Sequence, residues 1–249
     1  MEPKYTQEGH SVDATRSYES GLIVLEKLFQ HLDRVSSLLD VGGGLGTWSA
    51  AAKDLGVPRV ELIDGSWVNL DELKVKPEEF TQHDLENSLP LQINGKSHFD
   101  LAICMEVAEH LSPERAAGLV RDLCAKSDVV LFSAGVPLQG GLNHINEQWQ
   151  SYWVNLFKEQ GYTCHDVIRP QVWSHPKVNI WYKQNTLLFK QGQFQNEYVI
   201  LDLIHPDNWV HVNSLYQEAM TILHNRKIQR FLKRILPARW IFLLKKISR

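Results

Sequence analysis

The feature that most constrains this sequence is a cluster of glycines between an apolar segment and a helix-forming segment. Residues 38–51 read LLDVGGGLGTWSAA, so that a short apolar run leads directly into Gly42, Gly43, Gly44 and Gly46. Glycine allows sharp turns and close backbone approach, and a glycine-rich turn between a strand and a helix is typical of cofactor and phosphate sites. We therefore expect the backbone of this turn to approach a ligand.

Short apolar runs alternate with helical patterns along much of the chain. The predicted strands cover residues 37–43, 59–65, 80–85, 99–107, 128–136, 162–168 and 185–191. The predicted helices cover residues 13–35, 47–56, 112–127 and 146–161. Strands that are apolar almost throughout and alternate with helices are typical of a parallel sheet with helices on both faces. The sequence therefore predicts a doubly wound α/β fold with a mostly parallel, seven-stranded sheet.

Local signals predict where some of these elements end. Asp13 is the predicted N-cap of the first helix, and Ser112 that of the helix over 112–127. The aromatic residues of 146–161 recur at helical spacing, which predicts a stripe that faces the core. Residues 169–183 fit neither period, and we expect an ordered loop whose large side chains form a stacking wall for planar substrates or sugar rings. The side chains concerned are Trp173, His175 and Trp181.

The spacing of the glycines separates the candidate ligands. A nicotinamide fingerprint, G-x-G-x-x-G, needs a third glycine where Thr47 or Ser49 stands, and a Walker A loop needs a lysine that this turn lacks. An acidic residue followed by three spaced glycines does fit, at Asp40, Gly42, Gly44 and Gly46. A carboxylate at the end of the strand would repel a pyrophosphate, whereas it would attract a cofactor that carries an ammonium group.

With these residues the sequence resembles the class I S-adenosylmethionine-dependent methyltransferases, over roughly residues 36–191. The likeness is closest to the branch that includes the ubiquinone-biosynthesis O-methyltransferases. It implies a Rossmann-like methyltransferase fold, with S-adenosylmethionine held by the acid and the three glycines. It also implies that Asp64 accepts hydrogen bonds from the ribose hydroxyls, and that Asp84, with Leu85 beside it, reads the adenine.

The segment FDLAICMEVAEHL, residues 99–111, resembles the motif that follows the fourth strand in this family. The resemblance implies that Glu106 lies near the methionine end of the cofactor. A purely structural explanation stays open for part of the pattern. The glycines could form a tight turn that lets a helix pack closely on the sheet, and Asp64 could cap a following helix.

The residues that would act on the acceptor are carried by two short segments. Glu106, Glu109 and His110 stand at helical spacing, which predicts that they share one turn. The segment 140–153, after the fifth predicted strand, brings His144, with Asn146 and Glu147 close behind it. Methyl transfer to a hydroxyl requires a held nucleophile and the removal of its proton. The candidate catalytic residues are therefore Glu109, His110 and His144, with either histidine as general base.

A divalent metal is the alternative use of the same residues. The Glu-x-x-Glu-His arrangement resembles the metal-binding motif of the small-RNA 3′-terminal 2′-O-methyltransferases and of some quinone O-methyltransferases, and His144 matches a later histidine of the RNA enzymes. Carboxylates and imidazoles that converge on an ion could hold and acidify vicinal hydroxyls. In the other interpretation no metal binds, and Glu109 and His110 brace the loop.

The end of the chain differs in charge from the rest. All 29 acidic residues lie within 1–218, whereas 219–249 contains nine lysines and arginines and no acid. Apolar residues interleaved with cations are typical of an amphipathic helix at an anionic membrane interface. A helix that docks on the acidic body or on a second subunit fits equally well. Nucleic acid is an unfavourable partner because the rest of the chain is acidic.

Composition predicts three regions and a reducing compartment. We expect a helical cap over residues 1–35, a cofactor-binding domain over 36–192 and an extension over 193–249. Three widely spaced cysteines argue against a disulfide framework, and no apolar segment resembles a secretory signal or a membrane span. The expected location is cytoplasmic, with peripheral contact at the inner face of a membrane as an option.

The function predicted from the sequence is S-adenosylmethionine-dependent methyl transfer to a hydroxyl of a small molecule, a sugar or a lipid-linked intermediate. One alternative is a metal-assisted enzyme for vicinal hydroxyls, on a quinone precursor or an RNA 3′ end. Another is a non-catalytic protein that binds the cofactor as a scaffold. A nicotinamide oxidoreductase is disfavoured because neither glycine register completes its fingerprint.

Overall fold

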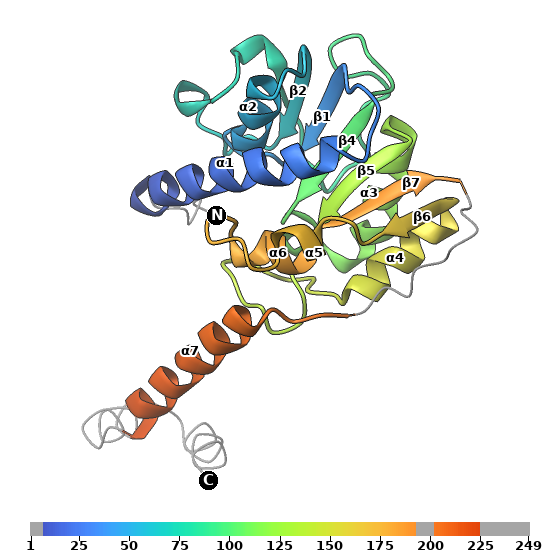
Figure 1. The fold of residues 1–249 in the computed structure, drawn as a ribbon. Helices are drawn as coiled ribbons and strands as arrows, with labels where there is room; N and C mark the ends of the chain where they lie inside the picture. The colour runs from blue at the N-terminus through green and yellow to red at the C-terminus, as the bar shows by residue number, and fades with distance from the viewer. Residues whose placement is uncertain (1–6, 193–201, 225–249) are drawn as a thin grey trace. The chain divides into compact units, whose positions relative to one another are not determined.

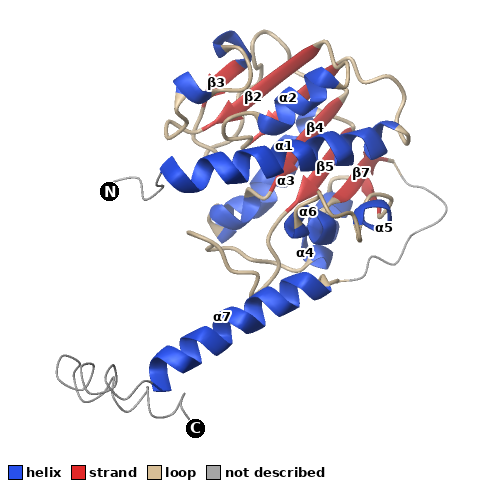
Figure 2. Ribbon diagram, turned by 60° about the vertical axis from the view of Figure 1, so that its left-hand side comes forward, coloured by secondary structure: helices blue, strands red, loops and turns tan. Residues whose placement is uncertain are grey.

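A computed structural model describes residues 7–192 and 202–224, and the chain divides after His205 into two units that are considered separately. The larger unit is built on a seven-stranded sheet with helices on both faces (Figures 1 and 2). Its strands are β1 (Ser37–Val41), β2 (Arg59–Asp64), β3 (Phe80–Gln82), β4 (Leu101–Met105), β5 (Val129–Ser133), β6 (Tyr162–His165) and β7 (Leu187–Gln191). The strand order is β3-β2-β1-β4-β5-β7-β6, and β7 alone runs antiparallel to its neighbours.

The helices connect these strands. They are α1 (Gln7–Phe29), α2 (Thr47–Asp54), α3 (Ala116–Lys126), α4 (Gln150–Glu159), α5 (Arg169–Val172) and α6 (Ile180–Asn185). Single 3-10 turns are η1 (Leu70–Glu72), η2 (Pro77–Glu79), η3 (Ala108–His110) and η4 (Pro113–Arg115). In the second unit the described residues form α7 (Pro206–His224). The prediction of a doubly wound, mostly parallel sheet is confirmed.

The strands are apolar throughout because both faces of the sheet are covered. In β4, Leu101 and Ile103 pack in the core that includes α1 and α2, whereas Ala102 and Cys104 pack in the core that includes α3 and α4. Successive side chains of a strand point to opposite faces, so a strand between two helical layers must be apolar at every position. This explains why the sequence shows continuous runs rather than alternation.

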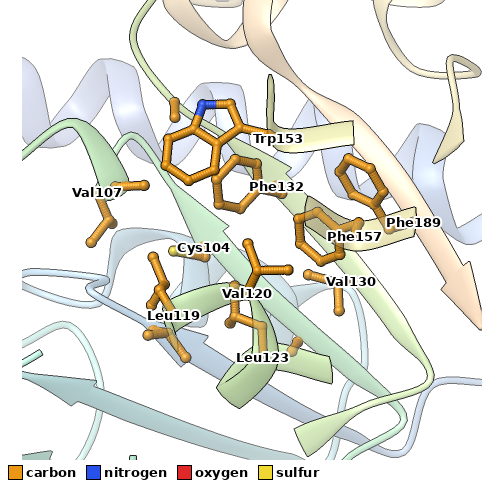
Figure 3. Packing of buried hydrophobic residues seen from close by; sticks show 14 of the residues in the cluster. Cys104, Val107, Leu119, Val120, Leu123, Val130, Phe132, Trp153, Phe157 and Phe189 are labelled. Carbon is orange, nitrogen blue, oxygen red and sulfur yellow. The ribbon is translucent and has the colours of Figure 1, made fainter. Parts of the chain in front are cut away.

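The core between the sheet and α4 is aromatic (Figure 3). Phe157 of α4 stacks on Phe189 of β7 with ring centroids 3.8 Å apart, and Trp153 contacts Phe132 of β5 at 5.1 Å. The predicted core-facing stripe is therefore confirmed at Trp153 and Phe157. Trp149, which precedes α4, is 39% exposed and does not belong to it.

Two local predictions were wrong, and a third was right only in part. The first helix begins at Gln7, so Asp13 lies inside it rather than at its N-cap. Ser112 does stand at the N-cap position, of the 3-10 turn η4 that leads into α3, but its side chain makes no capping hydrogen bond, because its backbone N–H and its hydroxyl both donate to the Glu86 carboxylate at 2.7 Å. The supposed loop over 169–183 contains α5 and the start of α6. At Ser112 the residue type indicated the helix start correctly, but a tertiary contact took the side chain away from the cap.

Most of the predicted basic tail lies outside the described residues. Only its first part, up to His224, is described, as the end of α7, and residues 225–249 are not. In the part of the chain that the structure describes, no helix combines the length and the apolar character that a bilayer span requires. The predicted domain boundaries after residues 35 and 192 remain predictions.

Candidate functional site

A cleft of about 630 Å³ opens at the carboxyl ends of the central strands. Its walls come from the segments that follow β1, β2, β3 and β4, and from the loop after β5. Sequence-predicted residues in its lining are Gly42, Gly44, Asp64, Asp84, Leu85, Glu106 and His110. In open α/β sheets ligands bind at this edge, where neighbouring connections leave the sheet in opposite directions. The strand order places that point between β1 and β4.

Two of the glycines between β1 and α2 are required by different constraints. Gly42 has φ +77°, and a Cβ there would lie 2.5 Å from Val107 Cγ2, so both conformation and space exclude a side chain. A Cβ at Gly43, which the motif had left out, would lie 2.3 Å from Asp40 Oδ2. At Gly44 an added Cβ would meet no atom within 4 Å. The turn therefore presents bare backbone to the cleft.

Asp64 is fixed at the end of β2 by backbone donors. Its Oδ2 accepts from Gly44 N at 2.7 Å and its Oδ1 accepts from Gly65 N at 2.6 Å. Burial raises the pKa of this carboxyl group, and the two backbone hydrogen bonds oppose that rise. Asp64 does not cap a helix, since η1 is capped by Asn69. Its carboxylate thus links the glycine turn to the cleft and keeps lone pairs for a ligand.

The residues predicted to read an adenine lie at the outer part of the cleft. Leu85 is buried and contributes an apolar wall. Asp84 is exposed, and its carboxylate accepts from Glu86 N at 3.0 Å and from Asn87 Nδ2 at 3.2 Å. The side chain of Asp84 therefore stabilises the turn after β3 as well as bordering the cleft.

Asp40 lines a second cavity of about 220 Å³, which shares the glycine turn with the main cleft. The carboxyl group is buried and accepts a hydrogen bond from Ser49 Oγ at 2.8 Å. Burial, helped by the negative charge of Asp64, raises the pKa of Asp40 to about 7, although the hydrogen bond from Ser49 opposes this. A cation bound in the cavity would therefore stabilise the ionised form of Asp40.

Sequence reasoning missed the hydroxyl groups of this second cavity. Ser17 Oγ of α1 lies 3.0 Å from Thr47 Oγ1 of α2 and 3.2 Å from Tyr182 Oη of α6. The three residues come from helices far apart in the chain. No local spacing brings them together, so no motif could have found them.

Glu106 is separated from Glu109 and His110 by its backbone conformation. It has φ +55°, which is uncommon for a residue with a side chain, and it precedes the 3-10 turn η3 that holds the other two. Its Oε2 accepts from Gln139 Nε2 at 2.9 Å, and its Oε1 accepts from Asn185 Nδ2 at 3.0 Å. The predicted common helical turn is therefore wrong, and both amide partners were missed.

Glu109, His110 and His144 come together as the sequence predicted. One potential ligand atom from each lies within 4.8 Å of the others. In the described residues neither carboxylate oxygen of Glu109 has a hydrogen-bond partner of normal geometry, although the side chain is fully buried. Burial, followed by the nearby Glu106 carboxylate, raises the pKa of Glu109 well above its usual value. A buried carboxylate without donors is an unusual feature that calls for a proton or a cation.

The two histidines face each other at this cluster. Their ring centroids are 4.7 Å apart, at an interplanar angle of 87°. Burial lowers the pKa of His110, and the neighbouring His144 lowers it further, so this ring is neutral at physiological pH. Asn146 does not point at the cluster but donates to Ala108 O at 3.3 Å. The loop that carries His144 is thereby tied to η3.

The predicted aromatic wall is not part of either cavity. Trp173, His175 and Trp181 are absent from the lining of the main cleft and of the second cavity. The ring of Trp173 instead packs on His205, with centroids 4.5 Å apart. Trp173 therefore packs against another part of the same chain.

The fold and the cleft together define a class, an open doubly wound α/β protein whose ligand site lies at the carboxyl ends of its central strands. A family model described as a methyltransferase domain matches residues 22–203. The chain belongs to this family of methyltransferase domains. The match does not extend to the ubiquinone-type branch, which stays a prediction. No curated protein matches the chain at a significant level of sequence similarity.

Solved structures with a TM-score above 0.5 share the fold at low sequence identity. Magnesium protoporphyrin IX methyltransferase (ChlM) from Synechocystis PCC 6803, with bound SAH, is 16% identical over 77% of this chain and 90% of its own, with a TM-score of 0.53. The methyltransferase domain of bacterial CtHen1-C is 18% identical over 71% of this chain and 100% of its own, with a TM-score of 0.51. TnmH is 17% identical over 74% of this chain, which spans only 57% of TnmH, with a TM-score of 0.49.

Proposed function

We propose that the chain binds S-adenosylmethionine in the main cleft and transfers its methyl group to a hydroxyl of an acceptor. The observation that carries this proposal is the bare glycine backbone beside Asp64, at the carboxyl end of β2, in a chain of the methyltransferase family. A ligand-bound relative with the same fold, ChlM with SAH, supports the choice of cofactor.

The residues present fit such a cofactor. Asp64 is held in place by two backbone donors and would accept from the ribose hydroxyls. Leu85 would pack on the adenine, with Asp84 at its edge. Asp40, buried beside the glycine turn, would pair with the ammonium group, and Glu106 would lie near the same end. The cofactor supplies an electrophilic methyl group for an in-line displacement, so the protein has to hold and deprotonate the acceptor.

His110 and His144 are the groups suited to that deprotonation. His110 is neutral at physiological pH because burial lowers its pKa, and a neutral imidazole can accept a proton. His144 lies beside it, on the loop between β5 and α4. The same loop exposes apolar side chains, with Leu138 82%, Leu142 52% and Ile145 60% exposed. They support an acceptor with an apolar part, such as a lipid-linked intermediate, over a bare sugar.

Isothermal calorimetry with S-adenosylmethionine, S-adenosylhomocysteine and NAD tests the cofactor. We expect both sulfur compounds to bind and NAD not to. Asp64→Asn should weaken them by about 10- to 100-fold, because hydrogen bonds to a charged group contribute about 1.5–3 kcal/mol. Asp71→Asn, on the exposed turn η1, is the matched control and should bind as the parent does. Binding of NAD alone would refute the proposal.

Turnover separates an enzyme from a scaffold. A cell extract supplied with the purified chain and methyl-tritiated cofactor should yield a labelled product that the chain without its histidine pair, His110→Ala with His144→Ala, does not yield. The product identifies the acceptor. Tight cofactor binding with no labelled product in any extract fraction would favour the scaffold, which needs the cleft but no base.

A divalent metal at Glu109, His110 and His144 is the second candidate, and one observation favours it. The Glu109 carboxylate is fully buried without a hydrogen-bond donor of normal geometry among the described residues, beside two imidazoles. A bound cation would stabilise that carboxylate and could hold vicinal hydroxyls of an acceptor. Glu106 is not among the residues whose ligand atoms converge here, and its oxygens accept from Gln139 and Asn185.

Binding of Mn²⁺, followed by electron paramagnetic resonance, tests this candidate. Glu109→Gln should abolish the bound signal, whereas Glu114→Gln, at an exposed position on η4, should retain it. EDTA should then also abolish methyl transfer. Full activity in EDTA together with no bound Mn²⁺ would leave Glu109 as a protonated, structural residue.

Membrane contact through residues 219–249 also stays a proposal, supported only by their basic and apolar composition. Co-sedimentation with anionic liposomes tests it. Full-length chain should pellet and a chain ending at residue 218 should not. Equal and poor pelleting would instead favour docking of the tail on protein.

A further inference from the structure

One carboxylate organises the loop that carries His144. Glu147 Oε2 accepts from Leu138 N at 2.8 Å, and Glu147 Oε1 accepts from Gly140 N at 2.8 Å. The same Oε1 lies 2.9 Å from Nδ1 of His144. Both side chains are largely shielded, with 19% of Glu147 and 11% of His144 exposed. The loop is thus closed on itself around Glu147.

These contacts decide which nitrogen of His144 carries the proton. A backbone N–H can only donate, so both oxygens of Glu147 act as acceptors. A hydrogen bond between Glu147 and Nδ1 then requires the imidazole to donate. In the neutral ring this leaves Nε2 unprotonated, and it is the nitrogen that can accept a proton or bind a ligand.

The ring is also held by the shape of the backbone around it. A Cβ added at Gly141 would lie 2.2 Å from His144 Nε2, and one added at Gly135 would lie 3.3 Å from the same ring. Only glycine at 141 therefore leaves room for the imidazole in this position. On its other side the ring meets His110 edge to face. The hydrogen bonds and the packing thus hold the imidazole of His144 in the same orientation.

We propose that Glu147 is a positioning residue, which holds His144 as the Nδ1–H tautomer and so leaves Nε2 as the nitrogen that can accept a proton or bind a ligand. The inference deepens the proposed methyl transfer, and its functional part rests on it. The tautomer and the closed loop, however, are properties of the protein without any ligand. They can be measured independently of whether a methyl group is transferred.

The direct test is nitrogen NMR of the full chain with ¹⁵N-labelled histidine at pH 8, with His144 assigned by the signals that His144→Gln removes. We expect the Nδ1–H tautomer. Glu147→Gln should reduce its share, because an amide has one acceptor oxygen and cannot receive all three donors. Glu159→Gln, at an exposed position on α4, is the matched control and should leave the spectrum unchanged. An Nε2–H tautomer in the parent protein, or an identical spectrum in Glu147→Gln, would overturn the proposal.

Turnover provides the second readout. Glu147→Gln should lower kcat by about 10- to 100-fold, the usual effect of removing the partner that orients a functional histidine, while the Kd for S-adenosylmethionine stays unchanged. Gly141→Ala should lower kcat as well with Glu147 intact, since its Cβ displaces the ring. Unchanged kcat in both variants would overturn the positioning role. Failure of the parent to bind S-adenosylmethionine would refute the proposed function but leave the tautomer result standing.

Discussion

Replacement of Asp40 by asparagine should stabilise the free protein while it weakens cofactor binding. The Asp40 carboxyl group is fully buried, and burial raises its pKa from the ordinary value of 3.8 to about 7. Ionisation in the folded state therefore costs free energy that an uncharged side chain avoids. The ligand-free protein is therefore less stable with Asp40 than with an uncharged residue, because only a bound ligand compensates the buried negative charge.

The size and the sign of this stability change follow from the difference between the pKa of Asp40 in the folded state and its pKa in the unfolded state. A shift of about 3 units corresponds to roughly 4 kcal/mol, because each unit is worth about 1.4 kcal/mol. Well below the ordinary value of 3.8 the group is protonated in both states and no stability is lost. As the pH rises from the pKa of Asp40 in the unfolded state to its pKa in the folded state, the parent protein loses stability. Above about pH 7 this loss is complete. The variant has no such group.

Urea denaturation of ligand-free parent and Asp40→Asn at pH 5 and pH 8 measures this difference. The unpaired amide hydrogens of the variant cost about the same at both pH values. The stability of the variant relative to the parent should therefore increase by roughly 2–3 kcal/mol from pH 5 to pH 8. A relative stability that is the same at both pH values would refute the claim that burial of Asp40 raises its pKa.

Three further predictions concern packing and reactivity. Gly42→Ala should destabilise the fold by about 1–3 kcal/mol and abolish cofactor binding, because φ is +77° and the new Cβ would meet Val107. The comparison variant is Gly56→Ala, where φ is +93° but an added Cβ would meet no atom within 4 Å. It should lower the stability and leave cofactor binding unchanged. Phe157→Ala should cost about 3–5 kcal/mol in urea denaturation, as its ring is fully buried in the aromatic core; a loss below 1 kcal/mol would contradict the packing. Burial raises the pKa of Cys124 to about 12 and also raises the pKa values of Cys104 and Cys164, so no cysteine should react with Ellman's reagent at pH 8 until the protein unfolds.

The strands and the glycine turn could be predicted because their signals are local. The run before Gly42 is apolar at consecutive positions because two helical layers cover it, and its glycines stand where the backbone must turn. Leu85 and Asp64 were assigned to the site by the resemblance to the methyltransferase family, and the structure places both in the lining of the cleft. Local periodicity was sufficient for the strands and the turn, whereas the assignment of these two residues needed the family motif.

The partners of the site residues could not be predicted, because they are distant in sequence. Nothing around Glu106 indicates that Gln139 and Asn185 would hold its carboxylate, or that its backbone would leave the helical turn of Glu109. The sequence by itself determined the doubly wound sheet, the position of the cofactor turn and the histidines that meet beside it. Only the tertiary structure decided which polar groups are satisfied, which are buried without a partner, and which nitrogen of His144 is free, because hydrogen bonding and burial depend on contacts between segments that no periodicity records.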